Sequence, residues 1–276
     1  MRTLFLLSLH SQHKQKYKNT KTQKHKNKFN MNILVCVSNV PDTTTKVKFN
    51  GTQLETEGVQ WIVNPWDELA ITRALELKES GAGVDKITIA TVGLVGTEAT
   101  IRKGLAMGAD DAFRVDADPK DAFFTATQLA EVVKAGSYDL IMTGFESADY
   151  NGISVGAMLA EILGYASVGA VSAVNIVDGK LQIDREIDGG KEVLSVQTPV
   201  VAAVQKGIAI DPRIPAMRGI MMARRKPLTV MPAVDVEAYT EVVEIELPQA
   251  KQAVKMFDAE DVQGLINALK NEANVI

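Results

Sequence analysis

Histidine is confined to the first 25 of the 276 residues, and the sequence contains one cysteine, Cys36. Beyond residue 25, no Ser/His/Asp or Cys/His nucleophile system can be assembled, and a zinc site built from histidines or several cysteines is excluded. A lone cysteine also excludes an internal disulfide framework and suits a reducing compartment. If the protein carries out chemistry, we expect a cofactor to bring the reactive group.

Acidic residues are absent from the first 30 positions, which hold seven lysines and one arginine. The leucine cluster near the start is too short to span a membrane. No small-residue cleavage site follows it, and a transit peptide would be richer in arginine and serine. We interpret residues 1–30 as a disordered basic extension, with a mis-assigned start upstream of Met31 or a targeting segment as the alternatives.

Without this extension the chain is strongly acidic. Residues 31–276 carry 22 basic and 34 acidic side chains, a net charge of −12. A body of this charge is a poor nucleic-acid binder. No later segment is long and apolar enough for membrane insertion.

Apolar runs and helical patterns alternate between residues 32 and 163, which indicates an α/β fold. Residues 32–38 form a near-continuous apolar run, as expected for a central parallel strand covered on both faces. We predict a doubly wound, mostly parallel sheet of the Rossmann-like, adenine-nucleotide-binding type. Further strands are expected at 86–93, 111–115 and 138–144, and helices at 64–83, 96–110, 121–135 and through Val155, Leu159 and Ile162.

The pattern changes after Leu163. Strands joined at Asp178-Gly179 and Gly189-Gly190 predict appended β-hairpins, and a smaller hairpin is expected around Asn50-Gly51. We divide the chain into the extension, a nucleotide-binding domain at 31–231 that includes a Pro-, Met- and Arg-rich loop at 208–227, and an extended C-terminal arm at 232–276. A last helix is expected from Asp258 to Lys270.

Four loops should meet at the carboxyl edge of the sheet, where α/β proteins bind ligands. They span 37–42, 64–67, 92–96 and 144–156. In the last one, free backbone N–H groups at Gly152–Ser154 could take an anion at a helix start.

Each loop also has a simpler interpretation. Asn64 reads as a helix N-cap with Pro65 at the first helical position and Asp67 three residues after the cap. Loop 144–156 reads as a solvated turn capped by Asp149 or Asn151. Neither GxxxxGK[ST] nor GxGxxG occurs, which favours nucleotide binding over phosphoryl transfer.

Two later stretches have unusual composition. "DREIDGGKEVL" (184–194) is either a polar hairpin tip or a charged element that reaches another domain or subunit. "DPRIPAMRGIMMARRKP" (211–227) places methionines among arginines and prolines, as in adaptable docking surfaces or in core gaps beneath a loop.

Together these motifs resemble the beta subunit of electron transfer flavoprotein. The resemblance runs from Asn32 to about Pro248. It includes the loops at 37–42, 64–67 and 144–156, the stretch "TIRKGLAMGAD" (100–110), the "DREIDGG" hairpin and the stretch at 211–227, in the family's order and spacing. It implies a heterodimer with an alpha subunit that holds most of an FAD. The pair would take electrons from flavin dehydrogenases, such as the acyl-CoA dehydrogenases of fatty acid β-oxidation, and pass them to a quinone oxidoreductase or another acceptor. The beta subunit would not be a catalyst by itself, and would reside in the bacterial cytoplasm or the mitochondrial matrix.

The resemblance also implies where cofactors lie. An adenine nucleotide, usually AMP, would be buried in this subunit with its phosphate on the loop and helix start at 153–155. Thr43 matches a position near the flavin ring. The implied cofactor-binding residues are Cys36, Asn64, Pro65, Trp66, Asp67, Val92, Gly93, Gly144, Asp149, Ile153, Ser154, Val155 and Thr43.

Partner contacts are implied at two further places. Glu186 matches a glutamate that reaches toward the alpha subunit's flavin domain. In the docking loop, Met217 stands where the family usually places an anchoring leucine, a swap that keeps volume and apolarity. Arg213 and Ile220 flank it.

The chain departs from the family at the nucleotide loop. Ser154-Val155 replaces a pair with glutamine, and Tyr150-Asn151 replaces an acidic run, so fewer side chains can donate to a phosphate. The nucleotide is therefore AMP or, as in bifurcating relatives, a second FAD. A stand-alone adenine-nucleotide sensor or hydrolase is the alternative from another class.

Overall fold

A computed structural model describes residues 30–50, 53–246, 249 and 253–276. The chain divides into two compact units, one of the described residues up to Lys48 with Leu54–Glu241, and the other of Phe49–Gln53 with Val242–Ile276. Apart from Asn30, the predicted basic extension lies outside the described residues, as does Gly51 of the predicted hairpin turn. All predicted site residues belong to the first unit.

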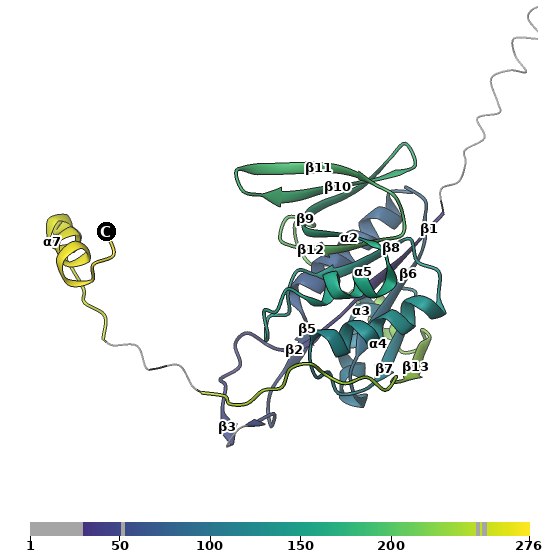
Figure 1. Ribbon diagram of the computed structural model, residues 1–276, viewed down its shortest axis with the longest axis horizontal. Coiled ribbons are helices and arrows are strands. Elements are labelled where there is room, and N and C mark those ends of the chain that lie inside the picture. Colours follow the sequence, from purple (N-terminus) through teal and green to yellow (C-terminus); the bar gives the residue numbers. More distant parts are fainter. Residues whose placement is uncertain (1–29, 51–52, 247–248, 250–252) are drawn as a thin grey trace, which may run out of the picture. The chain divides into compact units, whose positions relative to one another are not determined.

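The first unit is built on a nine-stranded sheet in the order β11-β10-β9-β12-β8-β1-β6-β7-β13 (Figure 1). Strands β9, β12, β8, β1, β6, β7 and β13 run parallel, whereas β10 pairs antiparallel with β9 and β11. The predicted doubly wound α/β fold is confirmed. The strands span Met31–Cys36 (β1), Val84–Val92 (β6), Asp111–Asp116 (β7), Leu140–Gly144 (β8), Ala166–Val177 (β9), Lys180–Ile187 (β10), Gly190–Val196 (β11), Val200–Val204 (β12) and Leu228–Pro232 (β13).

Helices cover both faces of this sheet (Figure 1). Alternate residues of β1 enter two separate cores: Ile33 and Val35 pack with α2 and α3, and Leu34 and Cys36 pack with α4 and α5. Burial on both faces explains why β1 is an apolar run. The helices span Pro65–Glu79 (α2), Glu98–Met107 (α3, after a 3-10 turn at Val95–Thr97), Ala122–Ala135 (α4), Val155–Leu163 (α5) and Met217–Ala223 (α6).

Sequence signals at the ends of the elements were mostly right. Gly108 ends α3 with a φ of 145°, a conformation that favours glycine. Asp178 and Gly179 both have positive φ, as a two-residue hairpin turn between β9 and β10 requires.

Four short elements were missed. Strands β2 (Asn39–Pro41) and β5 (Trp61–Val63) pair antiparallel, and β2 lies in the predicted loop 37–42. Helix α6 lies within the predicted loop 208–227, and β13 adds a parallel edge strand beside β7. Each element is short and depends on a distant part of the chain for its packing.

After β13 the chain runs along α4. The fully buried side chain of Gln128 donates to the carbonyl of Val234 at 2.8 Å and accepts from its N–H at 2.9 Å. Asp121 accepts from the N–H groups of Tyr239 and Thr240. These bonds hold the beginning of the predicted arm against the first unit.

The second unit contains β3 (Phe49–Asn50), which pairs with β4 (Gln53–Leu54), and a short helix α7, Val262–Asn267, that continues as a π turn to Glu272. Asp261 caps α7 by accepting from the N–H of Gly264 at 2.9 Å. The last helix is thus shorter than the predicted 258–270. Within the described ranges, no helix combines the length and apolarity needed to cross a membrane.

Candidate ligand cavity at the sheet edge

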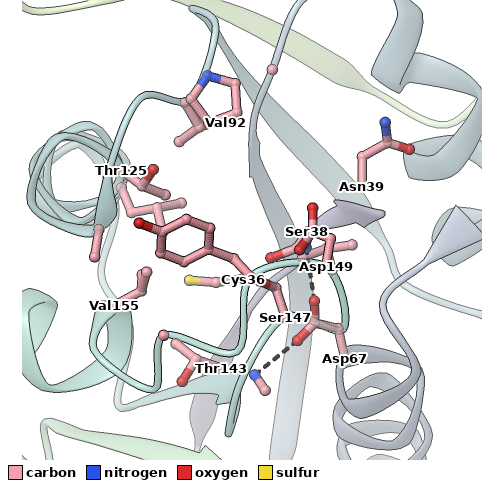
Figure 2. Close-up of a pocket in the computed structure, with 18 of the residues that line it drawn as sticks. Cys36, Ser38, Asn39, Asp67, Val92, Thr125, Thr143, Ser147, Asp149 and Val155 are labelled. Atoms are coloured by element: carbon pink, nitrogen blue, oxygen red, sulfur yellow. Dashed lines mark hydrogen bonds between the residues drawn. The ribbon is translucent and has the colours of Figure 1, made fainter. Parts of the chain in front are cut away.

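A cavity of about 730 Å³ opens at the carboxyl ends of β1, β6 and β8. Strand β1 lies between β6 and β8, because the chain leaves β1 for β6 on one side and later crosses to β8 on the other. Loops diverge at such a switch point and leave a crevice, which is where open α/β sheets bind ligands. Figure 2 shows side chains from these three strand ends and from α4 and α5 around the space.

Asp67, on the first turn of α2, joins two of these strand ends. Its carboxylate accepts from the N–H of Ser38 at 2.7 Å and from the N–H of Gly144 at 2.8 Å (Figure 2). Burial raises its pKa to about 7, and the hydrogen bonds from Ser38, Asn64 and Gly144 oppose that rise. Asp67 does stand three residues after the N-cap position, but its oxygens accept hydrogen bonds from across the crevice rather than from the start of the helix.

The side chain of Asn64 bonds to the loop after β8 rather than to the start of α2. It occupies the N-cap position, with Pro65 first in the helix, but its side chain makes no capping bond. Instead its amide donates to the carbonyl of Glu146 at 2.8 Å and accepts from the N–H of Ala148 at 3.1 Å. Asn64 therefore shapes the loop after β8, from a side chain that is 1% exposed.

The loop between β8 and α5 has an uncommon backbone. Asn151 and Ile153 have φ values of 53° and 54°, a region that a β-branched residue such as isoleucine rarely adopts. Ser154 follows in the right-handed region. Successive residues of opposite hand turn their N–H groups to one side and form a concavity for anions.

The donors of this concavity are free for a ligand. Within the described part of the chain, the N–H groups of Gly152, Ile153 and Ser154 donate no hydrogen bond. The Ser154 hydroxyl is engaged, since it donates to the carbonyl of Gly152 at 2.5 Å. An anion here would meet backbone donors at the start of α5, where the helix dipole also favours negative charge.

Cys36 lies at the end of β1 and lines the cavity (Figure 2). Burial is the main cause that raises the pKa of its thiol, and the nearby Asp67 adds to the rise. The thiol is therefore protonated at neutral pH and acts as a small apolar part of the wall.

Most of the predicted nucleotide residues meet in this cavity. Those that line it are Cys36, Asp67, Val92, Gly93, Gly144, Asp149, Ile153, Ser154 and Val155. Asn64, Pro65, Trp66 and Thr43 are not among the lining residues. Asn64 acts through the loop after β8, and Thr43 is exposed in a turn after β2.

The residues predicted from the sequence do not include one wall of the cavity. The loop after β7 and the first turns of α4 contribute Asp118, Lys120, Asp121 and Thr125. β7 is also a parallel strand of the sheet, so the rule that selected the other loops applies to its carboxyl end as well. Ser38, Asn39, Trp61, Thr143 and Tyr150 also line the cavity.

Charge in the cavity is predominantly negative. Among the lining residues Lys120 is the one cation. The carboxyl groups are those of Asp67, Asp118, Asp121, Glu146 and Asp149. No cluster of three or more His, Cys, Asp or Glu side chains in the described residues is arranged to hold a metal ion.

The predicted partner-docking residues lie away from the cavity. Glu186 is exposed on β10, opposite Lys191 of β11. Met217 begins α6 and is 74% exposed, and Ile220 on the same helix is also exposed. Arg213 binds Glu79 of its own chain.

These features define a doubly wound α/β protein with a cavity at the switch point of its sheet, into which a loop with unused backbone N–H donors leads. The family model described as "Electron transfer flavoprotein domain" matches residues 51–236. An electron transfer flavoprotein subunit beta from Syntrophomonas wolfei is 37% identical over 84% of this chain and 92% of its own length. The Bacillus subtilis subunit beta is 31% identical, and the mitochondrial one of Arabidopsis thaliana 33%, each over 89% of this chain and its own full length. The chain belongs to the electron transfer flavoprotein family and corresponds to its beta subunits.

Proposed function

We propose that this chain pairs with an alpha subunit, that the pair carries electrons on an FAD held mainly by the alpha subunit, and that the cavity holds AMP. The pair would take electrons from flavin dehydrogenases and pass them to a quinone oxidoreductase. The observation that carries the proposal is the cavity itself, with its backbone concavity at Gly152–Ser154, in a chain of this family. Family membership motivates the partner, the FAD and a location in the bacterial cytoplasm or the mitochondrial matrix.

The charges of the cavity favour a monophosphate. One phosphate can sit on the neutral N–H groups before α5, which supply attraction without requiring a basic side chain. A pyrophosphate brings further negative charge into a space lined by carboxyl groups and a single lysine. Like charges at close range disfavour that arrangement, so AMP fits better than a second FAD or ATP.

One observation favours the bifurcating alternative. The cavity extends beyond the residues expected for AMP, to Asp118–Ala122, Thr125 and Leu129 on the α4 side. A second FAD could use that additional space for the part of the molecule beyond its adenylate. The alternative therefore keeps the same site and changes its occupant.

Counting cofactors decides between the two. The full chain would be co-expressed with the adjacent alpha-type subunit, and the heterodimer would be denatured to release its nucleotides for chromatography. We expect one FAD and one AMP per heterodimer. Two FAD and no AMP would establish the bifurcating type, and a colourless chain that ignores the alpha subunit would overturn the proposal.

The second part of the proposal concerns docking. We infer that residues 208–227, here called the docking segment, bind the electron-donating dehydrogenases through an apolar surface. Its exposed apolar residues are Ile210, Ile214, Met217, Ile220, Met221 and Met222. Exposed Arg218, Arg224 and Arg225 lie beside them, which favours a partner with an acidic rim around an apolar pocket.

Met217→Glu tests this surface because it places a charge in an apolar anchor. We expect slower electron uptake from an acyl-CoA dehydrogenase at limiting concentration, with the FAD content unchanged. Equal rates for the variant and the parent protein would remove the docking role from the segment.

A further inference from the structure

We infer that Arg213 is a positioning residue: its ion pair with Glu79 fixes the exposed first half of the docking segment in the conformation that binds the partner. The inference rests on the proposed docking role. It differs from the expectation that Arg213 contacts the partner directly, because it assigns the guanidinium to the chain's own α2.

Two attachments join Arg213 to α2. Its guanidinium forms a two-pronged pair with Glu79, in which Nη2 donates to Oε2 at 2.7 Å and Nη1 donates to Oε1. Its backbone N–H donates to the Thr72 hydroxyl at 2.9 Å, and this buried hydroxyl donates to the carbonyl of Glu68 at 2.8 Å. A planar, bidentate arginine–carboxylate pair fixes orientation as well as distance.

The second half of the docking segment has its own attachments on α3. Arg102 donates to the carbonyls of Ala223 and Lys226, each at 2.8 Å. The backbone of α6 approaches α3 so closely at Gly219 that an added Cβ would collide with the carbonyl oxygen of Ala106. Helix α6 is therefore held whether or not Arg213 is present.

The first half depends on Arg213. Ile208 and Ala209 are buried, and the next stretch, residues 210–216, leads over the surface to α6. Arg213 lies in the middle of this stretch, between Ile210 and Ile214, whose side chains are 96% and 88% exposed. Its bonds to α2 thus determine where these two isoleucines are presented.

Releasing Arg213 should weaken docking without altering the electron-transfer step. If the segment adopts its binding conformation for only a fraction of the time, its apparent affinity for the dehydrogenase falls in proportion to that fraction. Exposed ion pairs are weak, and the two partners here are 31% and 58% exposed. Losing an exposed ion pair therefore corresponds to a rise in KM of about 1.5-fold to fivefold.

The test uses the full heterodimer with FAD and an acyl-CoA dehydrogenase reduced by its acyl-CoA. The variants are Arg213→Gln, Glu79→Gln and the double variant, with Lys134→Gln as a matched control that breaks an exposed ion pair with Glu131 on α4. Hydrogen exchange of residues 208–227 is measured on the same samples, because it reports order in the segment independently of the partner.

We expect each single variant to raise KM about 1.5-fold to fivefold and the double variant to match either single one. The kcat, the FAD content and the KM of the control should stay unchanged. Exchange should accelerate at the N–H of Arg213, which donates to the Thr72 hydroxyl, but not in α6. A rise in KM for Arg213→Gln alone would mean direct contact with the partner and overturn the inference, as would unchanged exchange. If Met217→Glu also leaves KM unchanged, the docking role itself fails.

Discussion

Replacing Asp67 by asparagine removes an ionisable group from the cavity floor while nearly preserving its shape. In the native chain this carboxyl is 2% exposed and receives two backbone N–H groups, from Ser38 and Gly144. Burial raises its pKa from an ordinary 3.8 to about 7. The folded state therefore keeps a proton that the unfolded state releases.

The sign and size of the effect follow from linkage. Because the folded pKa is the higher one, this group stabilises the fold fully below pH 3.8, and the contribution is lost as pH rises through 7. With one pKa unit equal to about 1.36 kcal/mol, the contribution is about 3 kcal/mol at pH 5 and nearly zero at pH 8. The asparagine variant has no such dependence. Between pH 5 and pH 8 the native protein should therefore lose about 3 kcal/mol of stability relative to the asparagine variant.

Urea unfolding of both proteins at pH 5, 6, 7 and 8, without added nucleotide, measures this difference. Asp178→Asn is the matched control, since Asp178 is an exposed carboxylate in a turn with positive φ that asparagine tolerates. Parallel pH curves for native and Asp67→Asn proteins would refute the reasoning, because they would mean that Asp67 titrates alike in the folded and unfolded states.

Three other substitutions, one of them with a matched control, address the same region. Gly144→Ala should destabilise the protein and reduce retained nucleotide, because its Cβ would collide with the Asp67 carboxylate. The control Gly190→Ala on β11 has open space and does not line the cavity, so it should match the native protein in thermal unfolding and nucleotide content. Ile153→Gly should raise the free energy of unfolding by about 1 kcal/mol by relieving a left-handed isoleucine, and a lower melting temperature would contradict that account. Asn64→Asp should lower AMP affinity in calorimetry, because a carboxylate does not donate to the Glu146 carbonyl, and unchanged affinity would show that the loop shape is set elsewhere.

The architecture was predictable because its signals are local. Buried parallel strands such as β1 are apolar runs, and glycine at positive φ marks helix ends and hairpin turns. β13 gave no such signal: Leu228–Pro232 is a short, partly exposed edge strand that ends in proline. Helix α6 was not predicted, because Gly219 lies within it and its apolar residues are exposed rather than aligned on a buried face.

The position of the cavity was predictable from the sequence, but the hydrogen bonds that shape it were not. Sequence order places loops at one sheet edge, and most predicted residues line the space. The roles of Asn64 and Asp67 depend on partners far along the chain, such as Glu146 and Gly144, which are 82 and 77 positions away. From the sequence alone, Asn-Pro-x-Asp predicts a helix N-cap. The groups that these two side chains bind instead come from distant parts of the chain, which the local pattern does not contain.

Cys36 has a practical consequence for work with this protein. It is the only thiol of the sequence, and burial keeps it protonated beneath the cavity. Alkylating reagents act on accessible thiolates, so the native chain offers them almost no target. A cysteine introduced at an exposed position, as in Met217→Cys, would then take a fluorescent or spin label selectively, and the native thiol could stay in place in the cavity wall.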